Sequence, residues 1–304
     1  MRLLFLGAGA VGGYFGGRLI EAGADVTFLV RPERAAALER DGLRIRSPLG
    51  DCDLEAKTVT RDSVTPDYDL VMLAPKAYDL AGAVESVEAA IGTRACILPF
   101  LNGLAHMDVL DARFGRDRVL GGVAHIAAVL ESDGTVRQLS DLHVLTAGGR
   151  DDETQGVAAK FIDLCRPAKF DSVLSPDIET SLWEKWTLLA TLAGITTLMQ
   201  GSVGQIMETR DGEALIRQLQ GECLAVASAS GVQVSARARS QATALLTRRG
   251  STFAASMLRD LSSGHRTEHD HVLGDMLARA DRLGIAAPLL RAAYCHMQVR
   301  AAAH

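Results

Sequence analysis

A glycine-rich stretch near the N-terminus has the spacing that most clearly indicates chemistry. Gly7-Ala8-Gly9-Ala10-Val11-Gly12 follows the apolar run Leu3–Leu6 and opens the helix-like run Tyr14–Ala22. In such a turn the first glycine allows a tight bend, the second lets a pyrophosphate approach the backbone, and the third lets helix and strand pack closely. The phosphates then meet the free N–H groups of the helix N-terminus. The stretch therefore predicts a dinucleotide site.

Arg31 bears on which dinucleotide binds. It follows the run Val26–Val30, about 20 residues after the glycine motif, where an NAD enzyme usually places an acidic side chain on the ribose 2'-hydroxyl. A guanidinium can instead form a charge-assisted pair with a 2'-phosphate. We therefore expect NADP rather than NAD. The alternative is a solvated arginine paired with Glu33, and Arg34 either supports the same phosphate or faces water.

The elements that position these residues follow from the pattern of the first half of the chain. Short β-branched runs alternate with helical segments, which predicts an α/β, Rossmann-like N-terminal domain with a parallel sheet. Two longer runs, Val119–Val129 and Val136–Thr146, are joined by the turn Glu131-Ser-Asp-Gly134 and predict an antiparallel hairpin at the edge of that sheet. The clearest parallel strands are Leu3–Leu6, Val26–Val30, Leu70–Ala74 and Cys96–Leu98.

After Pro176 the pattern changes to long apolar stretches of helical period. We therefore predict an all-α C-terminal domain, with the two domains at residues 1–173 and 174–304. The longest uncharged apolar stretch, Trp186–Met199, falls short of the ~20 residues needed to cross a bilayer. We expect a buried helix there, packed either within the monomer or against a second copy in a homodimer.

Length and composition exclude several classes of protein. The 304 residues are 48% hydrophobic and 23% charged, as in ordinary two-domain globular chains. A net charge of -5 argues against nucleic acid as a partner. The N-terminal apolar run is too short for a signal peptide, so we expect a cytoplasmic protein with no membrane partner. The five cysteines include no C-x-x-C pair and are expected to be reduced thiols.

Five motifs in compatible order resemble those of the ketopantoate reductase family. The similarity runs along nearly the whole chain, and it implies NADPH-dependent reduction of a small-molecule 2-oxo acid. The substrate would be ketopantoate, as in pantothenate biosynthesis, or a related branched 2-oxo acid. The motifs are residues 7–13, Ala74-Pro-Lys76, Leu101-Asn-Gly103, Trp183-Glu-Lys185, and Ser256-Met-Leu258 through Thr267-Glu268.

The resemblance implies three residues at the cofactor, in addition to the glycine stretch and Arg31. Lys76 and Asn102 are placed at the ends of sheet strands, beside the nicotinamide and its ribose, and Asn102 also serves the substrate. This agrees with the rule that such sheets bind ligands at the carboxyl ends of their strands. Ile126 contributes a backbone contact near the cofactor.

The resemblance also assigns the chemistry. Lys185 matches the family's acid catalyst, since an ammonium can stabilise the charge that hydride transfer leaves on a carbonyl oxygen and can donate the proton. Glu268, near the cofactor, would keep Lys185 charged and oriented. Ser256 would contact the carboxylate or hydroxyl of the substrate.

The chain departs from the family beside the catalytic lysine. Family members carry asparagines four and eight residues after it, where this chain has Leu189 and Ala193. On a helix these positions share a face with Lys185 and are expected to line the substrate. We therefore expect weaker discrimination in favour of ketopantoate, although a hydroxyl such as that of Thr196 could replace part of the lost contact.

Other interpretations remain open at this point. An opine-type dehydrogenase also joins a Rossmann domain to a helical domain, but condenses an amine with the oxo acid. A non-catalytic NADPH sensor would bind the cofactor without turnover. A metal site at His265, His269 and His271 is disfavoured, although the first two are spaced i, i+4, because lysine-driven hydride transfer needs no Lewis acid. We expect no metal and read these histidines as polar rim residues.

Overall fold

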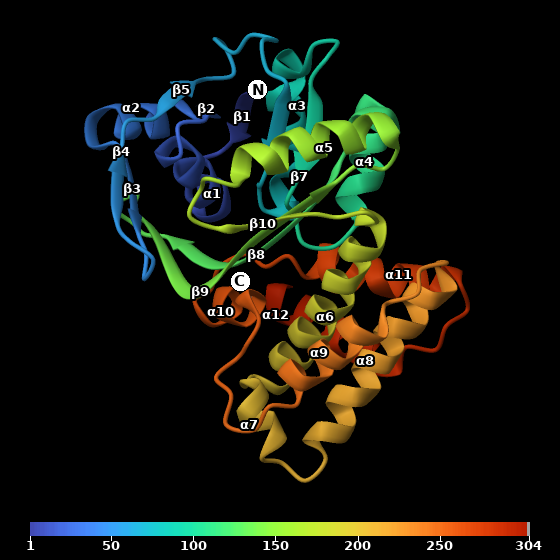
Figure 1. The fold of residues 1–304 in the computed structure, drawn as a ribbon. Coiled ribbons are helices and arrows are strands. Elements are labelled where there is room, and N and C mark those ends of the chain that lie inside the picture. Colours follow the sequence, from blue (N-terminus) through green and yellow to red (C-terminus); the bar gives the residue numbers. More distant parts are fainter. Residues whose placement is uncertain (303–304) are drawn as a thin grey trace. The chain divides into compact units, whose positions relative to one another are not determined.

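The computed structural model describes residues 1–302, which divide into two compact units (Figure 1). The first comprises Met1–Leu101 and His106–Glu179, and the second comprises Asn102–Ala105 and the chain from Thr180 onward. The first unit contains parallel strands and helices, and the described part of the second contains helices and no strand. The predicted fold class, an α/β domain followed by an all-α domain, is therefore confirmed.

The first unit is built on a parallel five-stranded sheet in the order β5-β2-β1-β6-β7. Four of its strands were predicted, and short β5 at the edge was not. The central strand carries Leu3, Leu4 and Phe5, all buried, because helices and a second sheet cover both of its faces. The strands are β1 (Arg2–Leu6), β2 (Asp25–Leu29), β5 (Lys57–Val59), β6 (Leu70–Leu73) and β7 (Cys96–Pro99).

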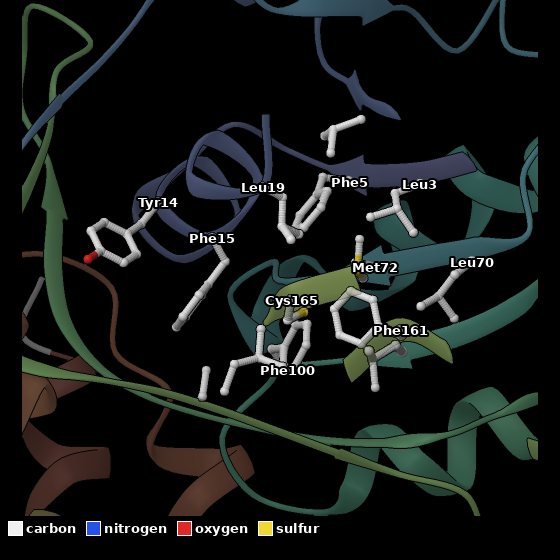
Figure 2. Packing of buried hydrophobic residues seen from close by; sticks show 14 of the residues in the cluster. Leu3, Phe5, Tyr14, Phe15, Leu19, Leu70, Met72, Phe100, Phe161 and Cys165 are labelled. Atoms are coloured by element: carbon white, nitrogen blue, oxygen red, sulfur yellow. The ribbon is translucent and has the colours of Figure 1, made fainter. Parts of the chain in front are cut away.

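Five α-helices and two 3-10 turns complete the connections around this sheet. Apolar side chains of β1 and β6 pack with those of α1 and α5 in one core (Figure 2). Phe15 of α1 and Phe161 of α5 are among its fully buried members. The helical elements are α1 (Ala10–Glu21), α2 (Pro32–Asp41), η1 (Ala77–Asp79), α3 (Leu80–Ile91), α4 (Ala105–Phe114), η2 (Arg116–Arg118) and α5 (Asp152–Cys165).

The predicted hairpin forms, but it does not finish the parallel sheet. Strands β8 and β9 pair antiparallel, with a register shift between Ile126 and Ala128. β9 also pairs with β3 and β10, so its second row of backbone groups is satisfied in a separate mixed sheet. This sheet has the order β10-β9-β3-β4 with β8 on β9. Its strands are β3 (Leu43–Arg46), β4 (Cys52–Leu54), β8 (Gly121–Leu130), β9 (Val136–Gly148) and β10 (Asp171–Leu174).

Helix α1 packs between the two sheets, and its glycines make this possible. A Cβ on Gly16 would lie 2.7 Å from Phe28 of β2, whereas a Cβ on Gly17 would lie 2.6 Å from Ile45 of β3. Both distances are far below van der Waals contact, so a side chain at either position would push one sheet away. The glycines that follow the dinucleotide motif therefore serve close packing of the helix on its two sides.

The second unit is a set of helices around α6. This helix begins at Ile178, eight residues before the apolar stretch, and Trp186 and Ile195 are buried within the chain itself. The two units divide at Glu179, six residues after the boundary placed at residue 173, because β10 still pairs with β9 of the first unit. The helices are α6 (Ile178–Met199), α7 (Val203–Met207), α8 (Gly212–Ala229), α9 (Ala236–Leu246), α10 (Ser256–Ser262), π-helix η3 (Asp270–Gly274), α11 (Asp275–Arg282) and α12 (Pro288–Ala302).

One buried carboxylate joins two of these helices. Glu222 of α8 accepts backbone hydrogen bonds from Leu289 at 3.2 Å and Leu290 at 2.8 Å, at the start of α12. The first N–H groups of a helix have no partner within the helix, so Glu222 caps α12 from outside. No helix in the described part of the chain is long and apolar enough to span a membrane, and all five cysteines are free thiols.

Candidate active site

The glycine loop of the first unit has the geometry that a pyrophosphate requires. Gly7 has φ +87° and donates its N–H to Leu29 at 2.8 Å, which makes the tight turn after β1. A Cβ on Gly12 would lie 2.6 Å from the carbonyl oxygen of Gly7, so helix and turn pack tightly. Apart from its two chain neighbours, a Cβ on Gly9 would meet no atom of residues 1–302 within 4 Å. Space therefore lies open beside Gly9 at the start of α1, where phosphates would bind.

The other residues of the glycine motif line the same turn. Ala8 is buried, whereas Ala10 and Val11, the first two residues of α1, are partly exposed. The backbone N–H of Gly13 donates to the carbonyl of Gly9 at 2.7 Å, which begins the helix. The N–H groups that precede it have no earlier carbonyl within the helix to bind and remain suited to an anion.

Arg31 and Arg34 occupy different positions beside this loop. Arg31 is exposed at the start of α2, and no carboxylate among residues 1–302, Glu33 included, lies within ion-pair distance of it. Arg34 does not simply face water, since its Nη2 donates to the carbonyls of Ala8 at 3.2 Å and Gly134 at 3.0 Å. Its Nε is buried without a hydrogen-bond partner. An orphaned guanidinium N–H next to the glycine loop fits a site for an anionic cofactor.

Desolvation acts on this second arginine. Burial lowers the pKa of Arg34, and the nearby charge of Arg44 lowers it further. A guanidinium still remains charged in a protein. The guanidinium of Arg34 is therefore a positive charge, partly buried, between the glycine loop and the β8–β9 turn.

The strand register brings further predicted residues to the same edge of the sheet. Leu6 pairs with Leu73, and Leu73 with Pro99, so the segments after β1, β6 and β7 leave the sheet side by side. The first of these segments is the glycine loop, and the second carries Lys76, exposed at the start of η1. Ile126 lies in the mixed sheet opposite His143, next to the register shift. Contacts of Lys76 and Ile126 with a cofactor stay predictions.

The second unit brings together Lys185, Glu268 and Asn102 from three distant parts of the sequence. Lys185, on α6, is partly exposed, yet burial of its ammonium lowers its pKa to about 8 while the charge of Glu268 opposes that shift. Glu268 is 9% exposed and precedes the π-helix. Asn102 Nδ2 donates to Glu268 Oε2 at 3.5 Å. The arrangement can hold a proton donor that titrates close to neutral pH.

His271 belongs to this cluster, although it was expected at a polar rim. A Cβ on Gly103 would lie 2.7 Å from the carbonyl oxygen of His271, so the segment after Asn102 packs directly on it. Burial lowers the pKa of His271, and the charges of Glu268 and Asp275 oppose that shift. Only its spacing of three residues from Glu268 could have indicated this from the sequence.

Of the other two histidines, His269 differs from the expectation of a polar rim residue, whereas His265 does not. His265 is exposed and lies outside any helix, so it shares no helix face with His269. His269 is buried and pairs through Nδ1 with Thr267 Oγ1 at 2.8 Å. Within residues 1–302, no three metal-ligating side chains gather in one place.

The two departures from the family pattern lie on α6. Leu189 is half-buried and Ala193 is buried, one and two turns after Lys185. Thr196 is fully buried, and its Oγ1 donates to the carbonyl of Leu192 at 2.6 Å and accepts the N–H of Ala255 at 3.5 Å. The expectation that Thr196 could replace a substrate contact is therefore wrong, because its hydroxyl is already used.

Ser256 was predicted to contact the substrate. It is exposed and is the first residue of α10, with Ala255 as the N-cap. Thr196 on α6 therefore anchors the residue that precedes Ser256. The structure places Ser256 at the start of α10 with its side chain accessible to solvent, and its role stays a prediction.

Comparisons with known proteins agree with this arrangement. The profile described as ketopantoate reductase PanE/ApbA matches residues 3–150, and the profile of its C-terminal part matches residues 177–301. An uncharacterised oxidoreductase YkpB of Bacillus subtilis is 36% identical over 98% of both chains. A 2-dehydropantoate 2-reductase of Halobacterium salinarum is 30% identical over 96% of both chains.

A solved structure supports the fold alone. D-mandelate dehydrogenase, in a ternary structure with NADH and anilino(oxo)acetate, is similar with a TM-score of 0.89 at 20% identity and covers 100% of this chain and 99% of its own. The two profiles and the relatives together account for nearly the whole sequence. The chain therefore belongs to the ketopantoate reductase family of NAD(P)-dependent oxidoreductases.

Proposed function

We propose that this chain reduces a branched 2-oxo acid with NADPH, and that Lys185 donates the proton to the carbonyl oxygen. The observation that carries the proposal is the ammonium of Lys185, with a pKa of about 8, next to the charge of Glu268. A general acid works best when its pKa lies near the operating pH. At neutral pH Lys185 is mostly protonated and can still release its proton during the reaction.

Four residues have distinct roles in the proposed reaction. Bound NADPH supplies the hydride. Lys185 stabilises the charge that develops on the substrate oxygen and protonates it. Glu268 favours the charged form of Lys185, and the amide of Asn102 orients the Glu268 carboxylate through the 3.5 Å hydrogen bond. Ser256 binds the substrate carboxylate or hydroxyl.

The preference for NADPH over NADH rests on two arginines. Arg31 offers an exposed guanidinium with no ion pair among residues 1–302, and Arg34 offers a buried Nε–H without a partner. Either group can pair with the 2'-phosphate that distinguishes the two cofactors. The fold does not decide the question, since D-mandelate dehydrogenase, which shares it, has NADH bound. Lys76 and Ile126 complete the proposed cofactor site.

The substrate preference rests on the α6 face that follows Lys185. Leu189 and Ala193 present methyl groups where amides would bind a substrate hydroxyl. We infer that 2-oxo acids with aliphatic branches are reduced at least as efficiently as ketopantoate. An uncompensated buried hydroxyl costs ~1 to 3 kcal/mol, which is enough to remove such a preference.

A substrate panel tests the proposal. NADPH oxidation is followed with 2-oxo acids of graded branching, from pyruvate through 3-methyl-2-oxobutanoate to ketopantoate, with and without added amino acids. We expect turnover of the branched acids without an added amino acid. Turnover that requires an amino acid would show an opine-type dehydrogenase, and tight NADPH binding without turnover of any acid would show a cofactor sensor.

A further inference from the structure

The side chain that follows Lys185 makes a long-range hydrogen bond. Trp186 is 1% exposed, and its Nε1 donates to the carbonyl oxygen of Val272 at 3.0 Å, 86 residues away. Val272 is itself only 3% exposed. Donor and acceptor are both withdrawn from water, so neither can exchange this partner for solvent without cost.

The acceptor lies in the segment that carries Glu268. Val272 is in the middle of the π-helix Asp270–Gly274, and its own N–H donates to the carbonyl of Glu268 at 3.0 Å. A π-turn displaces backbone groups from the regular helical pattern and is often found at functional sites. Here the indole binds one of the carbonyls of this turn. Two hydrogen bonds thus connect Trp186 through Val272 to Glu268.

The indole ring is fixed by its neighbours. The guanidinium of Arg279 lies 5.3 Å from the ring centre of Trp186 and 5.7 Å from that of Trp183. The two indoles are 4.9 Å apart, and Arg279 also pairs with Asp275 at 3.2 Å. Cation–π contact and close ring packing leave Trp186 little freedom to turn its N–H away from Val272.

We propose that Trp186 is a positioning residue for the reaction: its hydrogen bond to Val272 sets the place of Glu268 relative to Lys185. This inference rests on the proposed role of Lys185 as the acid. The charged and titratable groups on the π-helix and beside it are Glu268, His269, Asp270, His271, Asp275, Arg279 and Tyr294 of α12. Asp270 accepts the hydroxyl of Tyr294 at 2.7 Å and lies 3.5 Å from Nε2 of His269. Of these, Asp275 and Arg279 pair with each other, and burial keeps His271 neutral near pH 8. Glu268 is the group that acts directly on Lys185.

Loss of the Trp186 hydrogen bond should lower the pKa of Lys185. The charge of Glu268 raises the pKa of Lys185 against the effect of burial. If the N–H of Trp186 is lost, the Val272 carbonyl loses this donor, the π-turn shifts, and Glu268 supports Lys185 less well. The pKa of Lys185 then falls, and reduction declines at a lower pH than in the wild type.

The test compares two tryptophan variants. Trp186→Phe removes the N–H. Trp183→Phe is the matched control, because it makes the same change to the neighbouring ring beside Arg279 and keeps both an aromatic ring there and the N–H of Trp186. Trp186→Phe should lower kcat ~10-fold, since misplacement of order 1 Å can cost up to 10²-fold. Its Kd for NADPH should equal that of the wild type, and the alkaline limb of its pH–rate profile should move to lower pH. In Trp183→Phe the limb should stay.

A second substitution guards against misfolding of Trp186→Phe, which a thermal melt would reveal. Site-specific incorporation of benzothienylalanine at position 186 keeps the fused ring and replaces the N–H with sulfur, and it should cause the same shift. An unchanged alkaline limb in this folded variant overturns the inference. If Lys185→Ala is inactive while the alkaline limb of the position-186 variant is unchanged, only the positioning role of Trp186 is wrong. If Lys185→Ala stays active, Lys185 is not the acid and the proposed function itself is wrong.

Discussion

Asn102 Nδ2 and Glu268 Oε2 are joined by a 3.5 Å hydrogen bond across 166 positions of the sequence. The segment of Asn102 follows β7 and turns at Gly103, whose φ is +81°. A Cβ at position 103 would collide with His271. Because glycine has none, this turn can lie directly against the segment that carries Glu268. The amide of Asn102 therefore binds the carboxylate whose negative charge raises the pKa of Lys185.

Glu268→Gln should slow reduction and move its alkaline limb to lower pH, because the charge that raises the pKa of Lys185 is removed. The matched control is Glu184→Gln, an acid next to Lys185 in the chain whose carboxylate accepts the N–H of Ser235. The rate profile of each variant is measured from pH 6 to 10. Identical limbs in the two variants would contradict the role given to Glu268.

The wild-type enzyme should show opposite pH dependence in its two directions. Reduction needs the protonated amine of Lys185, so its rate falls as pH rises through about 8. Oxidation of the 2-hydroxy acid needs the neutral amine, so its rate rises through the same pH. Steady-state rates in both directions measure this, with Lys185→Arg as the control whose cation does not titrate. A reduction rate that stays constant to pH 10 is the contrary result.

Arg31→Ala should weaken NADPH binding by ~1 to 3 kcal/mol and leave NADH binding nearly unchanged, because a charge-assisted contact to the 2'-phosphate is lost. Arg34→Ala should weaken both cofactors, since Arg34 also joins the glycine loop at Ala8 to the turn at Gly134. Calorimetric titration of the wild type and both variants with each cofactor gives the six Kd values. Equal affinity of the wild type for NADPH and NADH would remove the basis of the cofactor proposal.

Much of the fold could be predicted because its signals are local. The glycine spacing, four parallel strands and the change to helical period each lie within a short window of sequence. The mixed sheet could not be predicted in the same way. Strand β3 is only four residues long and pairs with β9, which is distant in the chain, and the three-residue strand β4 pairs with β3.

The candidate site shows the same division. The glycine loop was predicted from its own residues, whereas Lys185, Asn102 and Glu268 were singled out only by resemblance to a family. The π-helix and the bond from Trp186 to Val272 depend on backbone groups brought together by packing, which no residue type reports. The sequence could not show that the Thr196 hydroxyl is already hydrogen-bonded, because its partners are backbone groups, the carbonyl of Leu192 and the N–H of Ala255.

Leu189→Asn combined with Ala193→Asn should shift preference towards ketopantoate, because the amides offer its hydroxyl partners on the face of α6 that follows Lys185. Leu189→Ala with Ala193 unchanged is the control for a change of size alone. The ratio of kcat/KM for ketopantoate to that for 3-methyl-2-oxobutanoate is the quantity to compare. A wild-type ratio of ~100 or more would show that the apolar face does not set the preference.

The most direct test of the account is single-turnover oxidation of bound NADPH by Lys185→Ala, compared with its Kd for NADPH. Lys185 acts on the carbonyl oxygen and not on the dinucleotide, so the rate of NADPH oxidation should fall ~100-fold or more while the Kd stays within about twofold of the wild type. Near-normal oxidation of NADPH by the best 2-oxo acid in Lys185→Ala would show that another group is the acid.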